Sequence, residues 1–223
     1  MFEHLKVVEL ASVLAGPLVG SFFAELGAEV IKFENKKVGG DVTRQWKLPQ
    51  EDPESSISAY YAAANFGKSI MMADLKNQVD YDTVVNYIKE ADVLILNFKA
   101  GSAEKLNLDF ESVKKINHHI IYASLTGYGE ENPRPAFDMI LQAESGFMSM
   151  TGEADGPPCK IPVAIIDVLA AHHLKEAILC AMIKHQKDRV ACEINISLYE
   201  SALASLVNQA THYLLPGHTP GRI

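Results

Sequence analysis

The sequence predicts an α/β protein whose largely parallel sheet is flanked by helices. Segments rich in Val and Ile alternate with amphipathic segments of helix length, and this order is typical of βαβ units. The chain has 223 residues and is 48% hydrophobic, so it can bury a substantial core. Strands are expected over residues 6–10, 29–33, 69–73, 92–96, 119–124, 161–166 and 190–196.

A predicted helix joins the first two strands. Pro17 follows Gly16, and the fixed φ of proline suits the first helical position, where a missing N–H group costs nothing. Leu18, Phe22 and Leu26 then repeat with the spacing of one helical face. The chain therefore begins with a strand, a turn, a helix and a second strand.

This opening is Rossmann-like and ends at an acidic residue, Glu34. A dinucleotide-binding turn needs three glycines, so that the backbone can approach a pyrophosphate. The turn here has only Gly16 and Gly20, Pro17 removes one donor, and Leu14 adds bulk. The sequence therefore predicts a Rossmann-like sheet without the usual NAD or FAD site.

Two irregular segments interrupt the alternation of strands and helices. Residues 39–66 contain paired glycines and two prolines, and residues 126–136 contain two glycines and two prolines. Long irregular segments are often functional or mobile. Between these segments, Tyr81, Val84 and Ile88 form the apolar face of a helix that leads into the fourth strand.

A lone carboxylate, Asp167, interrupts an apolar run between an expected strand and a long apolar helix. Asp is a favoured N-cap residue, so Asp167 is either a helix cap or a nucleophile. Strand ends that lead into helices line the binding crevice of open α/β sheets. Burial would raise the pKa of this carboxyl group, and the positive end of a helix would counteract that effect.

Composition argues against several classes of protein. The net charge is −8 and no basic stripe occurs, so no nucleic-acid partner is expected. Three cysteines without CxxC spacing suggest neither a disulfide framework nor a zinc site, and no metal is expected. No apolar run reaches the length of a membrane span, so we expect a cytoplasmic protein without membrane contact.

Five sequence blocks occur in an order that is more specific than any one block. They are VLAGP (13–17), LGAEVIKFE (26–34) followed by GGDVTR (39–44), ADVLILNF (91–98), YASLTGYGEENP (122–133) and QAESGFMSMTGEADGPP (142–158), which runs on to Asp167. Together they resemble the N-terminal portion of family III coenzyme A transferases. That group includes formyl-CoA transferases, carnitine CoA transferases and α-methylacyl-CoA racemases.

The resemblance implies a domain organisation. Residues 1–200 would form a Rossmann-like, CoA-binding large domain. Residues 201–223 would form a helix and the start of a linker to a small domain that is absent, so the chain is expected to be incomplete. The resemblance also implies an intertwined homodimer.

The resemblance further implies that the protein transfers coenzyme A from an acyl-CoA to a carboxylic acid. Asp167 would attack the thioester carbonyl and form a mixed anhydride and free CoA thiolate. The thiolate would then give an aspartyl-CoA thioester, from which the acceptor collects the CoA. Acyl-CoA and CoA are substrates in this scheme, and no permanently bound cofactor is expected.

A set of CoA-binding residues is implied in the same way. It consists of Ala15, Ala73, Lys76, Asn97, Phe98, Lys99, Lys105 and Arg134. Lys105 stands where the family often has Arg, so it would supply charge without a bidentate fork. Arg44 is a further cationic candidate. Each of these cations is equally consistent with a solvated surface charge, Asn97 with a strand-end turn and Phe98 with a core aromatic.

Two alternatives remain open. A racemase of this family would carry a histidine at the position of Phe137, before Asp138, because two groups must exchange a proton; transfer is therefore favoured over racemisation. A non-catalytic CoA-binding module or fragment is the second alternative. Leu14 replaces a glutamine of formyl-CoA transferase, which argues against formate or oxalate chemistry specifically.

Overall fold

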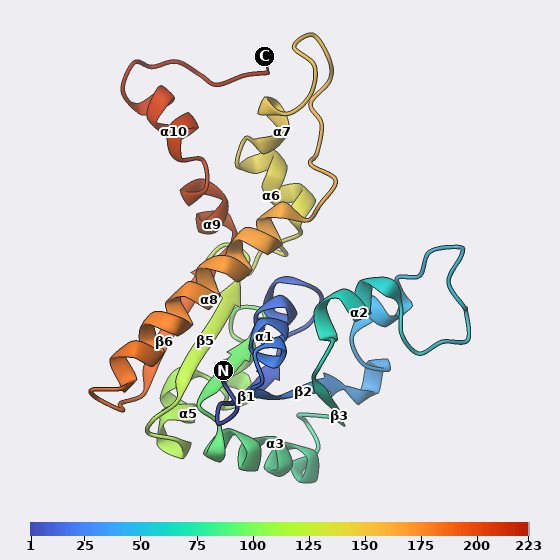
Figure 1. Ribbon diagram of the computed structural model, residues 1–223, viewed down its shortest axis with the longest axis vertical. Coiled ribbons are helices and arrows are strands. Elements are labelled where there is room, and N and C mark those ends of the chain that lie inside the picture. Colours follow the sequence, from blue (N-terminus) through green and yellow to red (C-terminus); the bar gives the residue numbers. More distant parts are fainter. Residues whose placement is uncertain (223) are drawn as a thin grey trace.

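The computed structural model describes residues 1–222 and is built around a six-stranded parallel sheet (Figure 1). The strands are β1 (Lys6–Leu10), β2 (Glu29–Asn35), β3 (Ser69–Ala73), β4 (Val93–Leu96), β5 (Ile121–Thr126) and β6 (Cys192–Ser197). Their order is β3-β2-β1-β4-β5-β6, and Val8 of β1 pairs with Ile31 on one side and Leu94 on the other. The predicted Rossmann-like α/β fold is confirmed.

Helices cover both faces of this sheet. They are α1 (Ala15–Glu25), α2 (Ala59–Asn65), α3 (Gln78–Glu90), α4 (Ser102–Lys105), α5 (Phe110–Ile116), α6 (Asp138–Glu144), α7 (Phe147–Met150), α8 (Ile165–His185), α9 (Leu198–Ala204) and α10 (Val207–Leu214), with short 3₁₀ turns η1 (Lys36–Val38) and η2 (Val42–Gln45). Residues of α1 and α8 share one hydrophobic core with the sheet, and residues of α3 and α5 share the other. Figure 1 shows α6, α7, α9 and α10 rising beyond the sheet.

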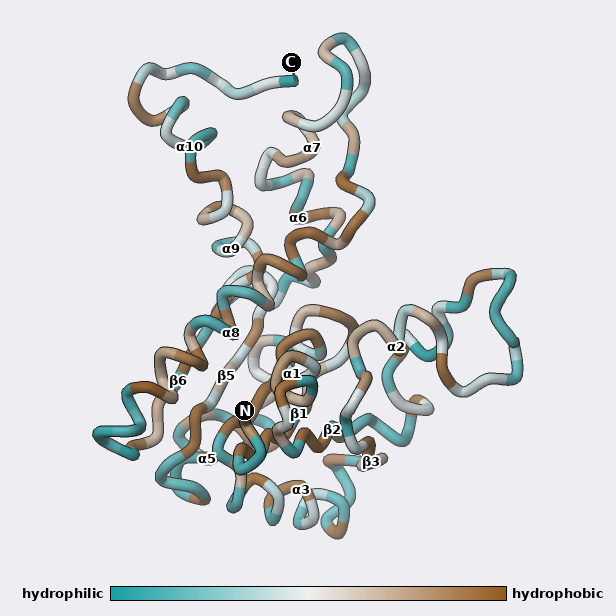
Figure 2. The backbone as a smooth tube through the Cα atoms, in the orientation of Figure 1, coloured by the Kyte–Doolittle hydropathy of each residue, from teal (hydrophilic) through white to brown (hydrophobic). Residues whose placement is uncertain are grey.

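The central strand β4 shows why the sheet needs two layers of helices. Its side chains alternate between the two cores: Val93 and Ile95 lie in one, and Leu94 and Leu96 lie in the other. All four are buried. A parallel sheet with both faces covered produces such continuous apolar strands, and Figure 2 shows hydrophobic residues concentrated in the central strands.

The strand expected over residues 161–166 is wrong. This segment is irregular, and α8 begins within it at Ile165. The side chain of Gln142 supplies the partners that a neighbouring strand would give, because its Oε1 accepts from Ile161 N at 2.8 Å. Its Nε2 donates to the carbonyl oxygens of Ile161 and Val163, each at 3.3 Å. A short apolar run does not distinguish a strand from the start of a buried helix.

Two helix predictions also need correction. Helix α1 begins at Ala15, so Pro17 is its third residue, where the N–H group would also lack an intrahelical partner. The single helix expected within residues 201–223 is instead divided: α9 ends at Ala204, and α10 begins at Val207. No helix within residues 1–222 is long and apolar enough to cross a membrane.

A buried ion network ties the edge of the sheet to its connecting segments. Lys32 of β2 is fully buried, and its Nζ lies 2.8 Å from Asp41 Oδ2 and 3.5 Å from Glu9 Oε1. Lys68 Nζ lies 2.7 Å from Glu9 Oε2 and donates to the carbonyl oxygen of Pro17 at 2.8 Å. Burial lowers the pKa of Lys68 to about 8. Each of these charges is desolvated and depends on its partners.

Removing one member of this network should therefore be far more damaging than removing an exposed charge. We expect Lys32→Met to lower the free energy of unfolding by about 3–5 kcal/mol, because Asp41 would lose its buried counter-ion. Lys6→Met is the matched control, since Lys6 pairs with Glu90 at 2.8 Å on the surface. Urea unfolding should not distinguish this control from the wild type. Equal losses for the two variants would contradict the account.

Candidate active site

Asp167 lies in the first turn of α8 and is not its N-cap. The N-cap residue is Ala164, and Asp167 is the third residue of the helix. Asp138, at the start of α6, does the capping from outside: its Oδ1 accepts from Ile166 N at 2.7 Å. Its Oδ2 accepts from Gln142 Nε2 at 2.6 Å. The hypothesis that Asp167 caps the helix is wrong, because the Asp138 carboxylate makes the capping hydrogen bond and the Asp167 carboxylate does not.

The electrostatic surroundings of Asp167 favour its neutral form. Burial and, to a smaller extent, the neighbouring Asp138 carboxylate together raise the pKa of Asp167 to about 7. No hydrogen bond within residues 1–222 reaches the Asp167 carboxylate. The expected compensation by the helix terminus is therefore incomplete, and the anion that forms near neutral pH is poorly stabilised.

Asp167 lines a cleft of about 590 Å³, which we call the nucleophile cleft. The β1–α1 turn, residues 12–15, forms one part of its wall, and residues 97–100 after β4 form another. Residues 132–138 come from the second irregular segment, and Trp46 and Tyr60 come from the first. The cleft thus lies at the carboxyl ends of β1 and β4, where the strand order reverses.

Two further clefts continue from the nucleophile cleft. A middle cleft of about 630 Å³ follows the ends of β1 and β2 and shares the wall formed by residues 97–99. A lysine cleft of about 590 Å³ lies between α3 and α4 and shares Leu75, Lys76 and Leu106 with the middle cleft. The shared lining residues place the three clefts next to one another along the carboxyl edge of the sheet, and we call this row of adjoining clefts the depression.

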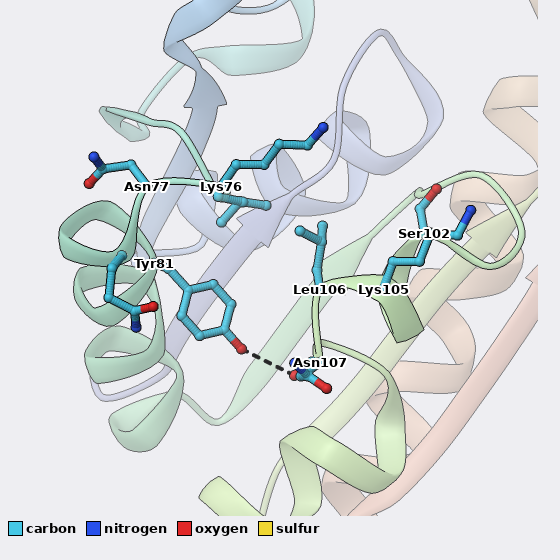
Figure 3. Close-up of a pocket in the computed structure, with 9 residues that line it drawn as sticks. Lys76, Asn77, Tyr81, Ser102, Lys105, Leu106 and Asn107 are labelled. Carbon is cyan, nitrogen blue, oxygen red and sulfur yellow. Dashed lines mark hydrogen bonds between the residues drawn. The ribbon is translucent and has the colours of Figure 1, made fainter.

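The far end of this depression carries unpaired positive charge. Figure 3 shows Lys76 after β3 and Lys105 on α4 at the lysine cleft, where the Tyr81 hydroxyl donates to the Asn107 carbonyl oxygen at 3.4 Å. Within residues 1–222, neither Lys76 nor Lys105 forms an ion pair, and Lys99 of the shared wall forms none either. These ammonium groups are therefore available to an anionic ligand.

All eight residues expected to bind CoA line the depression. Ala15 and Arg134 line the nucleophile cleft, Ala73 lines the middle cleft, Lys105 lines the lysine cleft, and the remaining four are shared between clefts: Lys76, Asn97, Phe98 and Lys99. The Asn97 amide is already engaged, because its Oδ1 accepts from Ser12 N at 3.0 Å and its Nδ2 donates to Ser12 O at 2.8 Å.

Arg44 does not line any of the three clefts. Its Nε donates to Glu34 Oε2 at 2.7 Å, and its Nη2 donates to the Tyr61 hydroxyl at 2.6 Å. This pairing also occupies Glu34, the acid near the end of β2, where a dinucleotide-binding fold would hold a ribose. A Cβ at Gly20 would lie 1.9 Å from Glu9 Oε2, so this glycine serves the close packing of α1 on β1.

Sequence reasoning missed three contributors to the site. Trp46 and Tyr60 pack edge to face, with ring centroids 4.9 Å apart, at the nucleophile cleft. In the sequence, only their position in the irregular segment 39–66 pointed to a role in the site. Asp138 was considered as the neighbour of Phe137, and its role as a cap depends on a hydrogen bond across 28 residues that local patterns do not reveal.

The histidine that a racemase of this family would carry is not found at the nucleophile cleft within residues 1–222. None of the residues that line the nucleophile cleft is a histidine. Phe137 occupies the N-cap position of α6 and is 64% exposed. Proton exchange next to a thioester requires an acid and a base on the substrate, and Phe137 supplies neither.

A six-stranded parallel sheet of this order, with clefts along its carboxyl edge, defines a Rossmann-like α/β protein. Residues 2–223 match the sequence model of CoA-transferase family III, and the chain belongs to that family.

Similar proteins agree with this membership. The chain is 41% identical to succinate–glutarate CoA-transferase of Agrobacterium fabrum, with 98% of this chain and 56% of that protein covered. It is 30% identical to succinyl-CoA:mesaconate CoA-transferase of Haloarcula hispanica, with 99% and 57% covered. The crystal structure of a CaiB/BaiF family protein from Brucella suis superposes with a TM-score of 0.93 at 39% identity, with 99% and 59% covered. The chain spans about half the length of the curated relatives that it matches.

The raised pKa of Asp167 has a consequence for stability. Between the ordinary Asp pKa, near 4, and about 7, the unfolded chain loses a proton that the folded protein keeps, so the free energy of unfolding falls as pH rises. We expect Asp167→Asn to stabilise the protein at about pH 8 and to have a smaller effect at about pH 5, measured by urea unfolding. Asp155→Asn, in an exposed loop, should change neither value. A lower stability of Asp167→Asn at about pH 8 would contradict this electrostatic account.

Proposed function

We propose that the protein transfers coenzyme A from an acyl-CoA thioester to a carboxylic acid, with Asp167 as the nucleophile. The observation that carries the proposal is the row of adjoining clefts, with unpaired lysines at one end and Asp167 at the other. The groups of coenzyme A are arranged in the matching order, because its phosphates lie at one end and its thiol at the other. The family membership supports the same activity.

The lysine cleft would bind the phosphates. Lys76 and Lys105 would pair with phosphate oxygens as point charges, since lysine lacks the bidentate geometry of arginine. Ala73, Asn97 and Phe98 would line the path of the uncharged arm. This arrangement would deliver the thioester to the nucleophile cleft.

The proposed reaction proceeds through two kinds of intermediate on Asp167. A carboxylate oxygen attacks the thioester carbonyl, the new C–O bond forms, and the C–S bond breaks to release CoA thiolate and leave a mixed anhydride. The thiolate then attacks the Asp167 carbonyl carbon, releases the donor carboxylate and leaves an aspartyl-CoA thioester. The acceptor carboxylate reverses these two steps, so Asp167 is regenerated and no net proton is consumed.

The surroundings of Asp167 suit this role. A carboxylate that is held by several hydrogen bonds would be stable and unreactive, whereas Asp167 receives none within residues 1–222. Its pKa of about 7 leaves a large ionised fraction at neutral pH. The cap on α8 comes from Asp138, so the helix does not depend on the reacting group.

Dicarboxylic acids are the proposed acceptors. Two relatives are named for succinate and glutarate and for succinyl-CoA and mesaconate, all of them dicarboxylates or their CoA esters. Lys99 and Arg134 line the nucleophile cleft and would pair with the second carboxylate. The Arg134 guanidinium lies 4.4 Å from the Tyr128 ring centroid and 2.5 Å from Glu144, which holds it near the cleft.

The remaining parts of the proposal concern organisation. Residues 1–200 would be the CoA-binding large domain, and residues 201–223 would lead to a small domain in an intertwined homodimer. Exposed apolar side chains at the end of α10, including Tyr213, Leu214 and Leu215, support a partner surface there. Free thiols at Cys159, Cys180 and Cys192 support a reducing, cytoplasmic environment.

An exchange assay with the full-length protein tests the proposal. With succinyl-CoA as donor and glutarate as acceptor, we expect glutaryl-CoA to form, and Asp167→Asn to lower kcat by at least about 1,000-fold. Lys105→Gln should raise KM for the acyl-CoA roughly tenfold with kcat little changed, because its charge binds substrate and transition state alike.

Lys114→Gln is the matched control for the lysine cleft. Lys114 lies on α5, pairs with Glu111 at 3.6 Å on the surface and does not line the depression. We expect its KM and kcat to equal those of the wild type. Retained transfer by Asp167→Asn, or equal KM effects for Lys105→Gln and Lys114→Gln, would overturn the assignment.

A further inference from the structure

The β1–α1 turn contains a strained residue at the nucleophile cleft. Val13 has a φ of 71°, in the left-handed region that β-branched residues rarely adopt. It lines the cleft together with Leu14, Ala15 and Asp167. Such conformations persist only when the surrounding structure holds them, and they cluster at functional sites.

Two side chains hold this turn from different parts of the chain. Asp41 Oδ2 accepts a hydrogen bond from Val13 N at 3.0 Å. Asn97 binds both the N–H and the carbonyl group of Ser12. The backbone immediately before Leu14 is therefore fixed on both sides.

Asp41 is itself tightly fixed. It is buried, its Oδ1 accepts from Thr43 N at 3.1 Å and from Thr43 Oγ1 at 2.8 Å, and its Oδ2 also accepts from Lys32 Nζ at 2.8 Å. Its own N–H donates to Glu34 Oε2 at 2.9 Å. Burial opposes the charged form, but Lys32 and Thr43 outweigh burial and lower the pKa of Asp41. Both carboxylate oxygens are thus committed, and one of them joins Val13 to the buried ion network.

We propose that Asp41 is a positioning residue for CoA transfer, because its bond to the Val13 N–H group holds the strained turn that lines the nucleophile cleft. The inference rests on the proposed function, since the turn has a catalytic consequence only if a thioester reacts at Asp167. Small displacements of such a wall reduce turnover, because reacting groups must meet in a narrow geometry. Asp41 acts through Val13 and touches no substrate.

The pair Asp41 and Val13 offers a rescue experiment. Asp41→Asn keeps the size of the side chain but replaces one of its two acceptor oxygens with an NH₂ group. The single remaining oxygen cannot accept from Val13, Lys32 and Thr43 together, so the turn can relax. Glycine adopts a positive φ without steric cost, so Val13→Gly removes the need for restraint. In the full-length protein, we expect Asp41→Asn to lower kcat at least about tenfold with KM for the acyl-CoA changed less than about twofold. Adding Val13→Gly should recover most of the lost kcat.

Asp109→Asn is the matched control for a purely structural role. Asp109 caps α5 and accepts from Ser112 N at 3.0 Å and Ser112 Oγ at 2.7 Å, as Asp41 does from Thr43. This variant should lower the midpoint of urea unfolding without changing kcat. Amide hydrogen exchange gives a second readout: exchange at Val13 should be at least about tenfold faster in Asp41→Asn than in the wild type.

The outcomes separate the two proposals. If the wild-type protein transfers no CoA, the proposed function fails, whatever the exchange rate at Val13. If the wild type is active and Asp41→Asn keeps its kcat, or if Val13→Gly rescues nothing, the positioning role of Asp41 is overturned while the proposed function stands.

Discussion

The reversal of strand order between β1 and β4 is the constraint on which the rest of the structure depends. The chain leaves β1 toward α1 on one face of the sheet, and it leaves β4 in the other direction, so a crevice opens between the two carboxyl ends. Asn97 bridges this point, because it follows β4 and binds the backbone of Ser12, which follows β1. The three adjoining clefts extend from there along the sheet edge.

The site combines a rigid frame with a poorly stabilised carboxylate. Lys32, Asp41 and Glu9 form a desolvated network under the β1–α1 turn, and every charge in it has a partner. Asp167 lines the nucleophile cleft beside this turn, it receives no hydrogen bond within residues 1–222, and burial raises its pKa to about 7. The paired ion network beside the proposed nucleophile therefore stabilises the fold, whereas the buried Asp167 carboxylate lowers the free energy of unfolding near neutral pH.

Much of the fold could be predicted because the parallel strands are nearly continuous in Val, Ile and Leu and alternate with helical periodicity. Asp167 also stood out locally, as the one charge in an apolar run. The lysines that line the depression, such as Lys105, came from the resemblance, since a lysine in a loop has no periodic signal. The strand expected over residues 161–166 was wrong because its backbone partners come from the Gln142 side chain.

The missed parts of the site share one physical property. The cap that Asp138 gives to α8, and the bond from Val13 N–H to Asp41, each join residues that are 28 positions apart. Neither residue type nor spacing reveals such contacts before the chain folds. The positive φ of Val13 was equally hidden, because valine ordinarily indicates an extended strand.

Acylation of the Asp167 carboxylate during CoA transfer is the step on which the proposed function depends. The most direct test is to incubate the full-length protein with an acyl-CoA, add hydroxylamine, and analyse the peptides by mass spectrometry. We expect a hydroxamate at Asp167 that is absent without acyl-CoA and absent in Asp167→Asn. Hydroxylamine modification at another residue, or transfer that proceeds with Asp167 unmodified, would contradict it.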